Sequence, residues 1–201
     1  MPRRPDMNRR AEIADRALQV VLERGVHKTT MSDIARALEM KRPALYWYFS
    51  DLGAVFEAAL GSLQQQVLRY VVDRVAQESH PIDQLYVALA AVVEFYQDKR
   101  ALLIGLFQLW AVTSTHGDPE SAIAQERELV EAPRGFLIAL VAQGIAEGQV
   151  RPCVPEALVD TVLTLIGGAQ VQRVTRDADL TPVLHFVREQ LLEPLRSEVS
   201  P

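Results

Sequence analysis

Cations and aromatic residues are concentrated in one eight-residue stretch of this chain, Lys41-Arg42-Pro43-Ala44-Leu45-Tyr46-Trp47-Tyr48. An arginine fork can donate two hydrogen bonds to N7 and O6 of guanine, and a lysine or a tyrosine hydroxyl can bond a phosphate oxygen. Proline, alanine and an aromatic ring suit apolar contact with a thymine methyl group. Together, these residue types could recognise double-stranded DNA.

A short helix would have to hold this stretch with aromatic side chains facing outward. At about 100° per residue, placing Leu45 and Phe49 on the inner face points Trp47 away from the core, with Tyr46 beside it. Large apolar groups that face solvent beside cations usually have a binding partner, so we expect Tyr46 and Trp47 to be exposed. Tyr48 lies closer to the edge of the core, and both a packed and an exposed position remain open for it.

Two further helices are predicted before this stretch. The first begins near Arg9 and has one apolar face, and Gly25 lies where a C-terminal glycine would end it. Thr30 is well placed as the N-cap of the second, with Asp33 at the capping-box position three residues later. The expected inner residues of the two helices are Ile13, Ala14, Ala17, Leu18, Val21, Ile34, Ala35 and Leu38.

The pattern Gly-x-x-x-Thr-Thr-x-x-x-Ile-Ala-x-x-Leu, followed by Pro-x-Leu-Tyr-Trp-Tyr-Phe, resembles the N-terminal DNA-binding domain of the tetracycline-repressor (TetR) family. The resemblance covers about residues 9–60. It implies an all-α homodimer whose third helix enters the major groove of a palindromic operator, and a C-terminal helical domain that binds a small-molecule inducer. We therefore expect a helix-turn-helix DNA-binding domain over residues 1–50 and a ligand-binding and dimerisation domain over residues 51–201.

The residues that this resemblance implies for DNA binding fall into two groups. Thr30 and Ser32 would lie near a phosphate or a base edge at the start of the second helix. The third helix would read bases with its first half and contact the DNA backbone with its end. The implied residues of the third helix are Lys41, Arg42, Pro43, Ala44, Tyr46, Trp47 and Tyr48.

Three positions depart from the family pattern. Glu39 lies in the turn where glycine is usual, and a residue with a side chain would be strained there or would change the turn. Lys41 replaces the usual capping serine and adds a cation. Leu52 replaces a lysine at the start of the fourth helix, so one phosphate contact is expected to be missing. We interpret these departures as changes in affinity and operator.

The charge is divided unevenly along the chain, whose net charge is −5. Residues 1–49 carry ten Lys/Arg and six Asp/Glu, a net +4, whereas residues 50–201 carry a net −9. The basic charge therefore coincides with the predicted helix-turn-helix, where a phosphate backbone would be attracted.

Helical periodicity and turn residues predict an all-α fold of about nine helices. Asp51 can cap a long helix from Leu52 to about Glu78, which would link the DNA-binding domain to the rest of the chain as a lever. Five further helices are expected at about residues 81–99, 101–114, 119–148, 156–175 and 181–197.

The C-terminal helices combine apolar walls with a few polar groups, as a ligand pocket does. Candidate ligand-binding residues are Phe107, Gln108, Trp110, Phe136, Gln143 and Gln170, although an ordinary core with polar side chains reaching solvent remains open. The last two helices have more apolar surface than one side of a bundle requires, which favours a two-fold interface over a thick monomeric core. Its candidate residues are Val162, Ile166, Gly167, Ala169, Leu184, Val187 and Leu191.

Other functional classes have little support in the sequence. No phosphate-binding loop, nucleophile elbow or zinc-protease motif is present, so we expect neither an enzyme nor a bound cofactor. The four histidines and the single cysteine show no metal-ligand spacing, and no metal site is expected. The apolar runs are too short to cross a membrane, and one cysteine fits a reducing cytoplasm.

Two hypotheses follow. The sequence favours a ligand-responsive transcriptional regulator, a repressor in the first instance, that binds its operator as a homodimer and is released by a small-molecule inducer. The alternative is a helical small-molecule-binding or scaffold protein whose DNA-binding domain is no longer used, which the altered turn and the missing lysine suggest.

Overall fold

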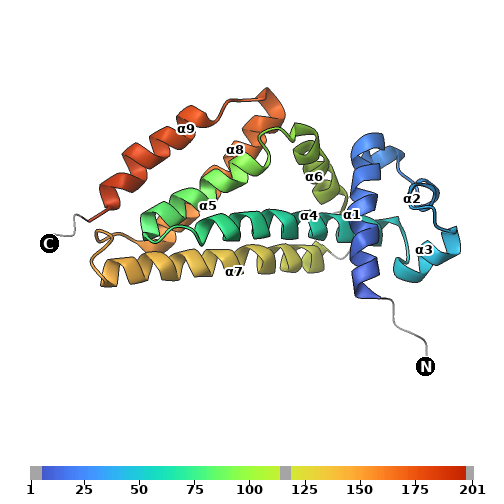
Figure 1. The fold of residues 1–201 in the computed structure, drawn as a ribbon, viewed down its shortest axis with the longest axis horizontal. Helices are drawn as coiled ribbons and strands as arrows, with labels where there is room; N and C mark the ends of the chain where they lie inside the picture. Colours follow the sequence, from blue (N-terminus) through green and yellow to red (C-terminus); the bar gives the residue numbers. More distant parts are fainter. Residues whose placement is uncertain (1–5, 114–118, 198–201) are drawn as a thin grey trace. The chain divides into compact units, whose positions relative to one another are not determined.

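The computed structural model describes the backbone of residues 6–113 and 119–197 and the side chains of residues 6–112 and 131–197. These ranges contain nine α-helices, which can be followed in Figure 1: α1 (Met7–Arg24), α2 (Met31–Ala37), α3 (Arg42–Tyr48), α4 (Leu52–Val75), α5 (Pro81–Phe95), α6 (Arg100–Thr113), α7 (Pro119–Ala146), α8 (Pro155–Arg176) and α9 (Thr181–Phe186). They contain no strand, only an isolated antiparallel bridge between Val150 and Arg196. The predicted all-α fold is confirmed. None of the described helices is both long and apolar enough to span a bilayer.

The chain divides into two compact units. The first consists of Met1–Gln66 with Ala101–Ile123, and the second of Val67–Arg100 with Ala124–Pro201. The chain passes from one unit to the other within α4, at the start of α6 and within α7. Each unit is built around its own cluster of buried apolar side chains.

Local signals define the helices of the first unit. α1 begins after Asp6, whose carboxylate accepts a hydrogen bond of 2.9 Å from the backbone N–H of Asn8, and ends at Gly25, where φ is 84°. All the inner residues predicted for the first two helices are buried. The core of this unit consists of Ile13, Ala14, Ala17, Val20, Met31, Ile34, Ala35, Leu38, Leu45, Phe49 and Val55.

A glycine lets α6 approach α1 within the same unit. Gly105 is buried, and a Cβ atom at this position would collide with the side chain of Leu22 on α1. The absence of a side chain therefore permits close packing between helices that are far apart in the sequence.

In the second unit, α5 packs against α8 and against η2 (Val187–Leu192), the turn that follows α9. Gly144 lies at another close approach, because a Cβ atom there would be 2.8 Å from Pro81 Cγ and 2.8 Å from Val150 Cγ2. The core of this unit consists of Val75, Ile82, Leu85, Ala88, Leu89, Leu137, Val141, Val150, Val159, Val162, Val187 and Leu192.

The last predicted helix, 181–197, is not one regular α-helix. α9 ends at Phe186, η2 continues with a wider i→i+5 turn, and the 3-10 turn η3 (Glu193–Leu195) follows. A wider turn brings residues five positions apart onto the same side of the helix. Val187 and Leu192 are therefore both buried, with exposures of 2% and 1%.

Candidate nucleic-acid interface

A complete capping box positions the start of α2. The Thr30 hydroxyl donates to Asp33 Oδ2 at 2.6 Å and accepts from the Asp33 N–H at 3.2 Å, while the Thr30 N–H donates to Asp33 Oδ2 at 3.1 Å. The hydrogen bond from the Thr30 side chain, with the charges of Arg24 and Arg36, holds the pKa of Asp33 below its ordinary value of 3.8. Thr30 is exposed beside this cap and Ser32 is half-buried. The predicted cap is confirmed.

The turn between α2 and α3 places Glu39 in the left-handed region, with φ of 53°. The Met40 N–H donates to the Ala35 carbonyl at 2.8 Å, and the Glu39 N–H donates to the Arg36 carbonyl at 3.1 Å. This pair of bonds is the Schellman arrangement, which usually has glycine at the left-handed position. The turn is kept at the cost of the backbone strain predicted for Glu39.

α3 is fixed to the core by two side chains and presents the others to solvent. Leu45 and Phe49 are 0% and 1% exposed, whereas Tyr46 and Trp47 are 43% and 52% exposed. The predicted division between inner and outer residues is confirmed. Tyr48 is half-buried and packs against the core, which settles the position that the sequence left open. Lys41, Arg42, Pro43 and Ala44 are exposed at the start of the helix.

The cations of the first unit differ in how their charge is used. Arg24 and Arg36 pair with Asp33 at 3.2 and 3.3 Å, and Arg16 donates to the Ala37 carbonyl at 3.1 Å. In the described part of the chain, no carboxylate pairs with Lys41 or Arg42. The positive charge beside α3 is therefore not neutralised by any described side chain of the unit, and it is available to an anionic partner.

Arg42 instead interacts with Tyr46 one helical turn later. Its Nη2 atom donates to the Tyr46 hydroxyl at 3.3 Å, and its Cζ atom lies 5.6 Å from the centre of the Tyr46 ring. The pattern of residue types does not reveal this contact, although positions four apart on a helix are neighbours.

The start of α4 carries a cap and no cation. Asp51 Oδ1 accepts from the Ala54 N–H at 2.9 Å, and this bond and one from the Ser50 hydroxyl lower the pKa of Asp51. The predicted cap is confirmed. Half-buried Leu52 leaves this helix start without the cation that the family pattern would place there.

The residues predicted for ligand binding are distributed over both units. Phe107, Gln108 and Trp110 belong to the first unit, and Trp110 is 44% exposed. In the second unit, Phe136 is 58% exposed, and the exposed Gln143 donates to Glu147 on its own helix at 2.7 Å. Gln170 on α8 is half-buried.

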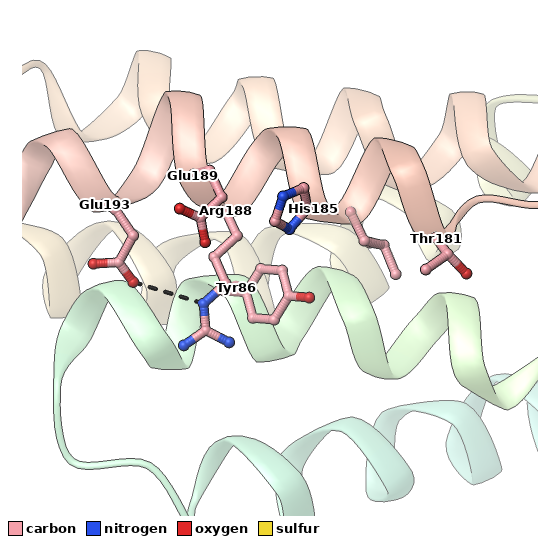
Figure 2. Close-up of a pocket in the computed structure, with 7 residues that line it drawn as sticks. Tyr86, Thr181, His185, Arg188, Glu189 and Glu193 are labelled. Atoms are coloured by element: carbon pink, nitrogen blue, oxygen red, sulfur yellow. Dashed lines mark ion pairs between the residues drawn. The ribbon is translucent and has the colours of Figure 1, made fainter.

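A cavity of about 780 Å³ in the second unit is lined by none of these ligand candidates. Figure 2 shows side chains of α9 and η2 facing Tyr86 on α5. Arg188 lies 3.6 Å from Glu193 Oε1, 3.7 Å from Asp83 Oδ1 and 4.9 Å from the Tyr86 ring centre. The sequence pattern did not predict that these residues lie close together, because their contacts depend on packing between distant helices. The lining residues are Tyr86, Thr181, Leu184, His185, Arg188, Glu189 and Glu193.

The predicted dimer residues divide into buried and accessible side chains. Val162, Ala169 and Val187 are buried by the chain itself, so their side chains lie in its own interior and are not available to a partner. Ile166 and Leu184 are half-buried, and Gly167 and Leu191 are exposed. Val171, Val183 and Phe186 are further exposed apolar side chains on α8 and α9, outside the set of candidate dimer residues.

Comparison with known proteins places this geometry among transcriptional regulators. Residues 13–59 match the bacterial regulatory proteins of the tetR family. Over 76 residues the chain is 34% identical to the probable HTH-type transcriptional regulator ArpR of Pseudomonas putida, a match that spans 38% of this chain and only 34% of ArpR. A TetR transcription regulator from Haloarcula marismortui has the same fold, with a TM-score of 0.78 at 20% identity over 96% of this chain and 100% of that one.

A longer match joins the two units in one comparison. Over 129 residues the chain is 31% identical to the uncharacterized HTH-type transcriptional regulator TtgW of Pseudomonas putida, covering 64% of this chain and 88% of TtgW. The capping box, the left-handed turn and the exposed face of α3 fall inside the matched family segment. The chain belongs to the tetR family of bacterial regulatory proteins.

Proposed function

We propose that this chain is a DNA-binding transcriptional regulator, a repressor in the first instance, that binds a palindromic operator as a homodimer. The observation that carries the proposal is the exposed face of α3, where Tyr46 and Trp47 stand beside two cations that no carboxylate of the described chain neutralises. Residues 1–50 bind DNA in this proposal, and residues 51–201 bind ligand and dimerise.

The DNA contacts are divided by chemistry. Arg42, Pro43, Ala44 and Tyr46 face base edges, because they combine a guanidinium fork with apolar groups. Thr30, Ser32, Lys41, Trp47 and Tyr48 contact the phosphate–sugar backbone and set the register of the helix on the duplex. The exposure of α3 supports this assignment, since its anchoring side chains Leu45 and Phe49 face the core.

The homodimer forms in this proposal through the exposed faces of α8, α9 and η2. Val171, Val183 and Phe186 are 47%, 41% and 58% exposed, and Leu191 is 40% exposed. The hydroxyls of Thr161, Thr164 and Thr175 donate to carbonyls of their own helix at 2.7, 2.7 and 2.8 Å, so these donors need no partner across an interface. Ile166, Gly167 and Leu184 complete the surface.

A dimer interface can be tested by Phe186→Glu, with Val154→Glu as the matched control. Phe186 is 58% exposed within the proposed interface, and Val154, 63% exposed, precedes α8. Sedimentation velocity is expected to show a dimer for the wild type and V154E and a monomer for F186E. A dimer for all three proteins would exclude this face as the interface.

The inducer is a small molecule held by the C-terminal domain. Two proteins of the same fold suggest a class to try first: AibR was solved in complex with isovaleryl coenzyme A and operator DNA, and FadR from Bacillus subtilis in complex with stearoyl-CoA. Isovaleryl-CoA and stearoyl-CoA are therefore the first probes. An inducer among them should raise the melting temperature and release bound DNA, and one that stabilises the protein without releasing DNA would speak against induction.

The regulator itself is tested on DNA that flanks its own gene. Fluorescence anisotropy at low salt should show tighter binding to a flanking duplex than to the same duplex with its sequence shuffled. Equal affinity for the two would leave only the electrostatic attraction that any basic surface has for DNA, and would contradict a sequence-specific regulator.

The strained Glu39 and the apolar Leu52 favour a second candidate, a helical small-molecule-binding or scaffold protein whose DNA-binding domain is no longer used. Arg42→Ala and Trp47→Ala separate the two functions, because both side chains are exposed and neither supports the core. A regulator should lose operator affinity in both variants at an unchanged melting temperature, with about 1–3 kcal/mol lost at Arg42. Unaltered affinity would favour the second candidate.

A further inference from the structure

Arg42 and Tyr46 form a pair on the exposed face of α3. The Arg42 guanidinium donates to the Tyr46 hydroxyl at 3.3 Å and lies 5.6 Å from the ring centre. The other described arginines of the first unit pair with carboxylates, donate to a backbone carbonyl or lie over a buried ring, as Arg10 lies over Phe49. Arg42 differs from them, because it donates to the neutral hydroxyl of Tyr46, whose side chain is exposed.

This contact restrains Arg42 without neutralising it. An arginine side chain has several rotatable bonds, and holding it in one arrangement on binding costs free energy. The Tyr46 ring has few rotatable bonds, and Leu45 and Phe49, both buried, fix the helix that carries it. The hydroxyl therefore holds the guanidinium in place before DNA arrives, and the full positive charge remains.

The hydrogen bond also leaves the donors that base recognition needs. A guanidinium has five N–H donors, and the bond to Tyr46 uses one of those on Nη2. The remaining donors still include a pair on one edge, which matches N7 and O6 of guanine.

We propose that Tyr46 is a positioning residue for Arg42, and that its hydroxyl sets the preference for the G·C pair that Arg42 reads. This inference rests on the proposed function, since it concerns how the same helix selects its operator. At this base pair the Tyr46 hydroxyl contributes to specificity through Arg42, while the Tyr46 ring faces a neighbouring base edge.

The test uses the full-length protein and a pool of duplexes with a randomised core. Selection with the wild type identifies the operator sequence. The G·C pair read by Arg42 is the pair whose replacement lowers the affinity of the wild type but not the affinity of Arg42→Ala. Discrimination is the ratio of affinities for the operator with and without this pair. It is measured for the wild type, R42A, Tyr46→Phe and the double variant.

The wild type should discriminate about tenfold to hundredfold, as expected for a bidentate contact. Y46F keeps the ring and loses only the hydroxyl, so discrimination should fall about threefold to tenfold, the range of one hydrogen bond. In the R42A background, Y46F should not lower the affinity for the operator any further, because the residue that the hydroxyl positions is absent. Since Tyr46 is exposed, the melting temperature should not change.

Three results would overturn the inference, and the last of them is distinguishable from the other two. Discrimination that survives in Y46F, or operator affinity that falls again when Y46F is added to R42A, would mean that the Tyr46 hydroxyl does not act through Arg42. If the wild type enriches no sequence at all, the proposed function fails and the inference fails with it. A matched variant, Tyr70→Phe, removes a tyrosine hydroxyl of the second unit, which donates to Glu94 at 3.4 Å, and should leave the discrimination ratio at this base pair intact.

Discussion

Glu39 holds the strained position in the helix-turn-helix, with φ of 53°. A residue with a Cβ atom loses about 1–2 kcal/mol in the left-handed region, and glycine does not. Glycine also gains freedom in the unfolded chain, which offsets part of the relief. Glu39→Gly is therefore expected to raise the free energy of unfolding by about 0.5–1 kcal/mol, measured by urea denaturation.

Glu39→Ala is the control for this substitution. Alanine removes the exposed carboxylate and keeps the Cβ atom, so the strain remains and the free energy of unfolding should stay close to that of the wild type. If E39A and E39G stabilise the protein equally, the gain comes from the lost charge and the argument from backbone strain is wrong.

Asp33 links the capping box of α2 to pH. The Thr30 side chain and the charges of Arg24 and Arg36 lower its pKa from 3.8, so the carboxylate form is favoured in the folded protein. A lowered folded pKa adds stability that is fully present above 3.8 and is lost as the pH falls through the folded value. Asp33→Asn, which keeps a side-chain acceptor and removes the charge, should be less stable than the wild type near neutral pH.

The difference in the free energy of unfolding between the wild type and D33N should narrow as the pH falls below 3.8, because Asp33 of the wild type then becomes neutral as well. Urea denaturation of both proteins along a pH series gives this difference directly. A difference that stays constant across the acidic range would show that the capping geometry contributes to stability and the charge of Asp33 does not.

At the level of helices, the sequence predicts starts and ends well, because they depend on neighbouring residues. Gly25, Thr30 and Asp51 cap or end their helices as their types indicate. The wider turn after Phe186 was missed, since it follows from burying Val187 and Leu192 together against other helices.

Packing between helices also decides which residues of the candidate sites the sequence could predict. Periodicity separates Leu45 and Phe49 from Tyr46 and Trp47, because a short helix on one core has only one inner face. α8 and α9 are apolar on more than one side, so periodicity cannot tell which side the chain itself covers. Val162 is an example: it is buried within the chain, although its residue type would suit an interface equally well.

Two glycines of α7 should respond in opposite ways to alanine. At Gly144 a Cβ atom would lie 2.8 Å from Pro81 Cγ, part of a rigid ring, and 2.8 Å from Val150 Cγ2, so Gly144→Ala should destabilise the second unit by about 1–3 kcal/mol. At Gly135 no atom lies within 4 Å, and Gly135→Ala should stabilise by up to about 1 kcal/mol through helix propensity.

Thermal denaturation of the two variants beside the wild type checks both signs. Because the residue change is the same, any general effect of replacing glycine in this helix cancels in the comparison. Equal shifts for G144A and G135A would mean that α7 and the start of α5 adjust freely at Gly144, and that this close approach does not constrain the second unit.

Over the whole molecule, the net charge of the N-terminal residues is opposite in sign to that of the rest of the chain. Residues 1–49 carry a net +4 and residues 50–201 a net −9, so attraction to DNA is concentrated where α3 lies. The acidic remainder limits non-specific binding elsewhere on the protein. Salt dependence of binding should therefore respond to cations beside α3 and not to cations of the second unit.

Replacing Lys41 should change the salt dependence of DNA binding by a calculable amount. It is exposed, precedes α3 and provides no side-chain cap, so Lys41→Gln should leave the fold intact. Each phosphate contact contributes about 0.9 to the slope of log affinity against log salt. A homodimer presents Lys41 twice to one operator, and K41Q should lower the slope by about 1.8.

Lys99→Gln is the matched control, because Lys99 belongs to the second unit, where its Nζ atom lies 4.0 Å from the Phe95 ring centre. K99Q should keep the wild-type slope. A decrease of about 0.9 for K41Q would indicate one protomer per operator, which would contradict the homodimer while retaining the phosphate contact. An unchanged slope would remove Lys41 from the interface, because a cation that displaces no counterion does not touch the phosphate backbone.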